Sequence, residues 1–149
     1  MEKHLPDSFH IEFVFNEIDQ FPFPEDSIRK WILAIIHKEK KEAGNLNFIF
    51  CSDDFVLAIN KQYLEHDTYT DILTFDYSND FGNISGDIYI SVDMVQFNAA
   101  KFEISFLEEL SRVMAHGVLH IIGYKDKNDE ETKVMREKEN YYLKMTDFL

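Results

Sequence analysis

The chain has 149 residues, 45% of them hydrophobic, and its formal net charge is −13. This length and apolar content suit a single domain over residues 1–149 with a continuous core. The negative charge excludes loose, sequence-independent attraction to nucleic acid or anionic lipid, because both depend on clustered Lys and Arg. We also expect no membrane association, because no apolar run reaches the ~20 residues that cross a bilayer and no apolar signal segment stands at the N-terminus. The lone cysteine, Cys51, cannot close an intrachain disulfide, which fits a reducing cytoplasm.

Two strands and a helix are expected in the first part of the chain. Apolar residues alternate with more polar ones in SFHIEFVF, residues 8–15, and in NLNFIFC, residues 45–51, as is typical of half-buried strands. The helix between them has apolar residues at i, i+3, i+4, i+7 and i+8, namely Ile28, Trp31, Ile32, Ile35 and Ile36. Prolines precede this helix, and Gly44 is expected to follow its end. The segment HKEKKE, residues 37–42, predicts a solvated helix face of mixed charge.

A helix and a β-hairpin are expected in the middle of the chain. Ser52 can cap a helix that runs to about Tyr63. The polar segment 64–71 has no helical stripe and predicts a loop. Strands at 72–78 and 85–91 then flank a turn rich in Asn, Asp and Gly, which indicates an antiparallel hairpin.

The last third of the chain predicts helices. A helical pattern begins at Asp93 and is interrupted at 102–104. The sequence SFLE at 105–108 is a capping box that restarts a helix through Ile122, and Gly123 is well placed to end it. A closing helix is expected after an acidic start in the final segment. The whole order predicts an α+β domain, a small mixed β-sheet of about four strands packed with about five helices.

The segment HGVLHIIGYKD, residues 116–126, carries the most specific chemistry. His116 and His120 are four residues apart, so their imidazoles share one helix face and can reach a common atom. Gly123 lets the chain turn back, and the carboxylate of Asp126 can approach the same point. Two imidazoles and one carboxylate leave an open coordination position, the pattern of a catalytic zinc site, here at the end of a central helix. The alternative for Asp126 is a loop residue that caps the final helix.

Gly117 distinguishes this segment from zinc peptidases of related spacing. Those enzymes place a glutamate directly after the first histidine, where it takes a proton from the metal-bound water. A glycine costs ~1 kcal/mol relative to alanine inside a helix, so it indicates close packing or open space beside His116. A peptidase would need its general base elsewhere.

Three segments resemble the motifs of one protein family and occur in the same order as in that family. Residues 58–75, AINKQYLEHDTYTDILTF, resemble LNxxYRxxDxPTDVLSF. Residues 85–91, SGDIYIS, resemble GDIxIS, and residues 116–126, HGVLHIIGYKD, resemble HGxLHLxGYDH. These are motifs of the YbeY family, metal-dependent endoribonucleases of bacterial rRNA maturation and ribosome quality control. The resemblance covers roughly residues 55–145 and is much more specific than any one motif alone.

The resemblance implies one zinc per chain held by His116, His120 and Asp126, with Asp126 at the place of the family's third histidine. Leu64 stands where the family has an arginine, which would be a natural phosphate contact. Asp71 matches an acidic family position and is the predicted catalytic residue, as a general base or as an orienter of an imidazole N–H. Its structural alternative is to cap a strand or to hold the loop by Asx hydrogen bonds.

The function that the resemblance implies is a zinc-dependent, single-strand endoribonuclease of rRNA maturation, including the 16S 3′ end, and of ribosome quality control. A metal-activated hydroxide or the RNA 2′-hydroxyl could attack the phosphodiester. We expect the acidic surface to dock on a basic ribosomal protein of a ribosomal particle while Lys125 and Lys127 contact ribosomal RNA. Two alternatives stay open: a metal-dependent hydrolase of another bond, such as peptide or ester, and a ribosome-associated assembly factor with a non-catalytic metal.

Overall fold

The computed structural model describes residues 10–64, 70–79 and 82–149, without the side chain of Leu64. The predictions for Leu64, for most of the loop at 64–71 and for the first residues of the strand at 8–15 therefore lie outside the described residues. Among the helices described, none is both long and apolar enough to cross a bilayer. The elements follow in chain order as β1 (Ile11–Phe15), α1 (Glu25–Lys38), β2 (Glu42–Cys51), α2 (Asp53–Leu64), β3 (Ile72–Asp76), β4 (Asn83–Ser91), α3 (Val92–Phe102), α4 (Phe106–Ile122) and α5 (Asp129–Leu143).

The strands form one mixed sheet in the order β1-β2-β4-β3. β2 pairs in parallel with both β1 and β4, whereas β3 pairs antiparallel with β4, so the predicted hairpin is confirmed. A parallel pair needs a crossover, which α1 supplies between β1 and β2. With five helices in the described chain, this is the predicted α+β architecture.

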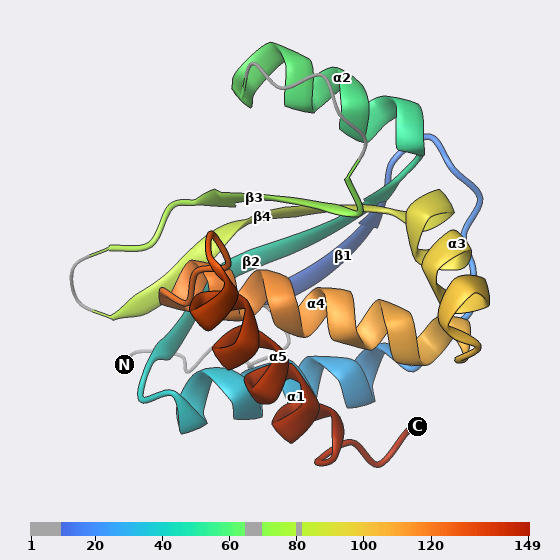
Figure 1. Ribbon diagram of the computed structural model, residues 1–149. Helices are drawn as coiled ribbons and strands as arrows, with labels where there is room; N and C mark the ends of the chain where they lie inside the picture. The colour runs from blue at the N-terminus through green and yellow to red at the C-terminus, as the bar shows by residue number, and fades with distance from the viewer. Residues whose placement is uncertain (1–9, 65–69, 80–81) are drawn as a thin grey trace, which may run out of the picture.

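The helices cover both faces of the sheet unequally (Figure 1). α1, α4 and α5 lie on one face over the main hydrophobic core, and α2 lies on the other. α4 is central to its layer, because it contacts α1, α3, α5, β3 and β4. Beneath α2 is a smaller core of Cys51, Val56, Ile59 and Leu73. The Cys51 thiol is fully buried, and burial raises its pKa to about 12.

α4 packs so closely on the sheet that Gly117 has no room for a side chain. A Cβ at Gly117 would lie 2.8 Å from Ile72 Cδ1 and 3.0 Å from Ile88 Cγ2. Of the two explanations for this glycine, close packing is therefore confirmed. Gly86 in β4 is similarly confined, because a Cβ there would overlap the carbonyl oxygen of Phe75 in β3.

The prediction that Gly44 follows the end of the first helix is wrong. α1 ends earlier, at Lys38, and the chain reverses at Lys40, whose φ is 61°. Gly44 lies inside β2, where a Cβ would lie 3.0 Å from the carbonyl oxygen of Ile84 in the neighbouring strand. This glycine serves a contact between strands, which spacing along the chain does not reveal.

Replacing Gly86 by alanine should destabilise the fold, because the new Cβ overlaps a backbone atom of β3. We expect a loss of about 1–3 kcal/mol in the free energy of unfolding, as at other overpacked sites. Gly117→Ala should cost less, because the ends of isoleucine side chains obstruct it and alanine gains ~1 kcal/mol of helix propensity. Urea unfolding measures both variants. A Gly86→Ala variant as stable as the wild type would show that β3 and β4 leave room for a side chain here.

Candidate functional site

The sequence places His116 and His120 on successive turns of α4. Ser105 caps this helix, its hydroxyl accepting an N–H of the first turn at 3.0 Å, as the capping-box pattern predicted. Gly123 ends it with a φ of 134°, a conformation that L side chains rarely adopt. The chain turns back at this point, and Asp126 Oδ2 comes to lie 3.3 Å from His116 Nε2.

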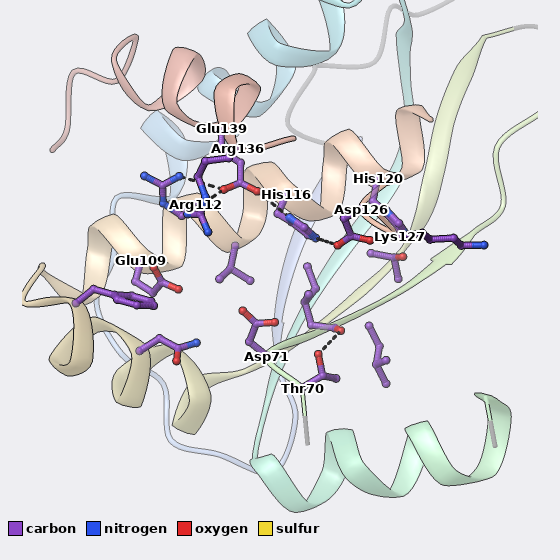
Figure 2. A pocket seen from close by; sticks show the side chains of 16 residues that line it. Thr70, Asp71, Glu109, Arg112, His116, His120, Asp126, Lys127, Arg136 and Glu139 are labelled. Carbon is purple, nitrogen blue, oxygen red and sulfur yellow. Dashed lines mark hydrogen bonds and ion pairs between the residues drawn. The ribbon is translucent and has the colours of Figure 1, made fainter. Parts of the chain in front are cut away.

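A buried carboxylate on α5 orients His116 (Figure 2). His116 Nδ1 donates to Glu139 Oε2 over 2.8 Å, and Arg112 donates to Glu139 Oε1 over 3.0 Å. Burial alone would raise the pKa of Glu139, but these two hydrogen bonds, together with the positive charges of His116 and Arg136, outweigh burial and lower it. Burial likewise opposes protonation of His116, but Glu139, Asp126 and Asp71 outweigh it and raise the pKa of this imidazole. Glu139 thus fixes the Nδ1 edge of His116, and the Nε2 edge faces Asp126.

A backbone carbonyl orients His120. Its Nδ1 donates to the carbonyl oxygen of Tyr124 over 3.0 Å. The rings of His116 and His120 are nearly parallel, with an interplanar angle of 11° and centroids 6.1 Å apart. Because both Nδ1 atoms have an acceptor, each imidazole keeps Nε2 for another partner. This is the way in which metal-binding histidines are usually held.

The predicted ligands meet at one cavity but do not form a closed metal cage. His116, His120 and Asp126 all line it. In the described parts of the chain, no three His, Cys, Asp or Glu side chains are already grouped to hold a metal. The donor types suit zinc, and zinc binding would require His116 Nε2, which lies 3.3 Å from Asp126 Oδ2, to carry no proton. The capping alternative for Asp126 is wrong, because Asn128 caps α5 and accepts an N–H at 2.8 Å.

The cavity has a volume of about 740 Å³ and lies between α4, α5 and the start of β3 (Figure 2). It brings the three predicted ligands together with Asp71 and Lys127. Lys125, the second predicted phosphate contact, is exposed and lines a separate hollow beside Tyr124. The two lysines that flank Asp126 therefore face different parts of the surface.

Asp71 lies directly before β3 and lines the cavity. Burial raises the pKa of its carboxyl, although the nearby His116 acts in the opposite direction. Burial also raises the pKa of Glu109, a buried residue of α4 on the same cavity. Glu139 and Tyr124 hold the two imidazole N–H groups, so the described contacts give the orienting role to them. The role of Asp71 as a general base stays a prediction.

Four charged residues of the cavity were given no role from the sequence: Glu109, Arg112, Arg136 and Glu139. Arg112 precedes His116 by four residues, so both lie on one face of α4. Arg136 lies 3.6 Å from Glu139 Oε1 and is 59% exposed. An arginine and a histidine on one face of an apolar helix are a signal that an acidic partner is needed. The sequence does not reveal which glutamate of the acidic last segment supplies it.

The sequence of the chain is similar to those of proteins that share one family description. A family model described as Endoribonuclease YbeY matches residues 13–147. The chain is 51% identical to Endoribonuclease YbeY of Flavobacterium psychrophilum over 130 residues, which cover 87% of this chain and 91% of that relative. It is 46% identical to Endoribonuclease YbeY of Cytophaga hutchinsonii, with 91% of this chain and 96% of that relative covered.

The fold is also similar to a solved structure. The solution structure of TM1509 from Thermotoga maritima matches with a TM-score of 0.60 and 28% identity, covering 90% of this chain and 87% of that protein. The family model and the relatives span most of the chain, including α4 and the loop that follows it. The chain therefore belongs to the Endoribonuclease YbeY family.

Proposed function

We propose that this protein is a zinc-dependent endoribonuclease that cuts single-stranded ribosomal RNA in the cytoplasm. Its roles are rRNA maturation, including the 16S 3′ end, and ribosome quality control. Family membership supports the nuclease activity. The observation that carries the proposal is the pairing of His116 and His120, whose Nδ1 atoms are both engaged so that both Nε2 atoms are left for a metal beside Asp126.

Zinc fits the donors that line this cavity. His116, His120 and Asp126 are two imidazoles and a carboxylate, a set that zinc accepts while leaving a position for substrate. A zinc ion held there supplies a Lewis acid that polarises a phosphoryl oxygen. Glu139 keeps the Nδ1 proton of His116 in place, so the imidazole presents a fixed Nε2.

The other residues of the cavity bind the substrate and move protons. Arg136 is 59% exposed and Lys127 is exposed, so both can contact the phosphates of an RNA strand laid across the cavity. Asp71 takes the proton of the attacking oxygen, a role helped by the raised pKa of its carboxyl. Gly117 lies against the sheet and contributes no base.

The negative charge of the chain shapes how it reaches RNA. A net charge of −13 repels the phosphate backbone, so affinity for naked RNA is low and falls steeply with salt. We propose that the acidic surface docks on a basic ribosomal protein and that this places the cavity over the RNA. Ribosomal particles are then better substrates than naked RNA.

Purified protein should contain about one zinc per chain and cut rRNA precursors in ribosomal particles, and a chelator should abolish the cut. His116→Ala and His120→Ala should each lose zinc and activity, because each removes an Nε2 ligand. His37→Ala, an exposed histidine of α1, is the matched control. Elemental analysis and gels of the cleaved RNA measure both properties.

Two results would contradict this assignment. Full zinc retention in both cavity variants would refute the site, and a zinc-loaded wild type that leaves particle rRNA intact would favour the assembly-factor alternative. Asp126 is tested within the same series. Asp126→Ala should weaken zinc binding, whereas Asp126→His should hold it at least as tightly. Equal affinity in all three forms would mean that Asp126 is only a loop residue.

Lys127→Ala should reduce rRNA cleavage more than Lys125→Ala, because Lys127 lines the cavity whereas Lys125 lines a separate hollow. Removing a cation that binds one phosphate should also lower the slope of log K against log salt by ~0.7–0.9. Zinc content should not change in either variant. RNA binding by filter retention over a salt series, together with cleavage rates, measures the effect. If both variants behave alike, the position of Lys127 has no bearing on RNA binding.

Glu139→Gln should destabilise the metal-free protein in a pH-dependent way. Because the pKa of Glu139 is lowered in the fold, its ionisation stabilises the protein at pH values above its ordinary pKa of 4.5. Because the pKa of His116 is raised, its protonation stabilises the protein below its ordinary pKa of 6.5, and this stabilisation is lost as the pH rises through the folded pKa. The pair therefore contributes most between these values. We expect a loss of about 3–5 kcal/mol near pH ~5.5, which shrinks as the pH rises through the raised pKa of His116.

Chelator-treated protein unfolded in urea over a pH series measures this loss. Glu137→Gln, on the exposed face of α5, is the control and should change little. A loss that is the same at both ends of the pH series would mean that the charge of His116 does not contribute.

A further inference from the structure

Glu39, the residue that follows α1, holds three side chains through one carboxylate. Its Oε1 accepts the hydroxyl of Tyr124 at 2.6 Å. Its Oε2 accepts Lys138 Nζ at 3.0 Å and, at short range, the hydroxyl of Tyr142. The side chain of Glu39 is 9% exposed, so these partners satisfy a largely buried charge.

The position of Glu39 differs from the one expected from the sequence. HKEKKE predicted a solvated helix face, which is wrong beyond Lys38, because α1 ends there and β2 begins at Glu42. Glu39 instead points into a network between α1, α5 and the loop after α4. Burial raises the pKa of Glu39, but the bonds from Tyr124, Tyr142 and Lys138 outweigh burial and lower it. The carboxylate is thus ionised at neutral pH and accepts from all three donors.

Tyr124 connects this network to the cavity. Its hydroxyl is bound by Glu39, its N–H donates to the carbonyl of Leu119 at 3.0 Å, and its carbonyl accepts Nδ1 of His120 at 3.0 Å. The residue follows Gly123, whose positive φ places this backbone outside the helix. The anchored hydroxyl therefore fixes a loop carbonyl that would otherwise depend on helix-end contacts alone.

We propose that Glu39 is a positioning residue for His120. Through the hydroxyl of Tyr124, it fixes the carbonyl that holds the His120 proton on Nδ1 and leaves Nε2 for the cavity. The value of this arrangement for zinc rests on the proposed function, but the tautomer of His120 does not. The residue that follows α1 thereby sets the tautomer of a histidine on α4.

The test compares Tyr124→Phe and Glu39→Gln with Tyr141→Phe. Tyr124→Phe removes only the hydroxyl, and Glu39→Gln places an amide N–H₂ against donors. Tyr141→Phe is the matched control, because its hydroxyl accepts from Lys38 between α1 and α5, whereas the hydroxyl of Tyr124 is the one that donates to Glu39. Nitrogen-15 NMR of the zinc-free protein reports the His120 tautomer, zinc competition reports affinity, and thermal melting reports stability.

We expect the wild type and Tyr141→Phe to carry the His120 proton on Nδ1. In Tyr124→Phe and Glu39→Gln, part of the population should shift the proton to Nε2, and zinc affinity should fall about tenfold, the lower end for loss of an outer partner of a ligand. A lower melting temperature without a tautomer shift would overturn the proposal, because the network would then serve the fold alone.

The two proposals fail separately. A tautomer shift in a protein whose wild type binds no zinc would support positioning by Glu39 and refute the zinc site. If the wild type binds zinc and the variants keep its His120 tautomer, the zinc site would be supported and positioning by Glu39 refuted. If Glu39→Gln does not fold, Tyr124→Phe decides alone, since it keeps the ring and its packing.

Discussion

The buried charge of Glu139 is the constraint on which the cavity depends. Glu139 is 3% exposed, so its charge must be paired, and the two side chains that hydrogen-bond its carboxylate, Arg112 and His116, are both on α4. α5 therefore cannot shift along α4 without breaking a charged contact. The docking of the last helix and the orientation of the first imidazole are thus one interaction. Because α4 also packs without a side chain at Gly117 against β3 and β4, the imidazole is fixed relative to the sheet as well.

The two imidazoles are held by different kinds of acceptor, and this gives them different chemistry. His116 donates to a carboxylate, whose charge makes the ring more basic, whereas His120 donates to a neutral carbonyl. The basicity of His116 depends on the charge of Glu139 on α5, whereas the orientation of His120 depends on where the loop after α4 places the carbonyl of Tyr124. A change in the packing of α5 reaches both rings, because Glu139 and the Lys138 contact to Glu39 lie side by side on that helix.

The fold was largely predictable because its signals are local. The N-cap at Ser105, the stop at Gly123 and the alternation in the strands each act within a few residues, and each is confirmed. The error at Gly44 and the unpredicted role of Glu139 have one cause: their partners are far away in sequence. For the same reason the histidines could be predicted to share a face, but the acceptors of their Nδ1 protons could not. Lys125 and Lys127 face different hollows because of a turn that spacing alone does not define.

The small core beneath α2 has a further consequence. Cys51, the last residue of β2, is buried beneath this helix, and its thiol donates weakly to the carbonyl of Ile90 at 3.5 Å. The thiol can meet a reagent only when α2 lifts from the sheet, since burial holds it in the unreactive protonated form. Opening of this face is therefore the step that limits modification of the cysteine. The rate at which Cys51 is modified therefore reports how often the structure opens locally on the side of the sheet opposite α4.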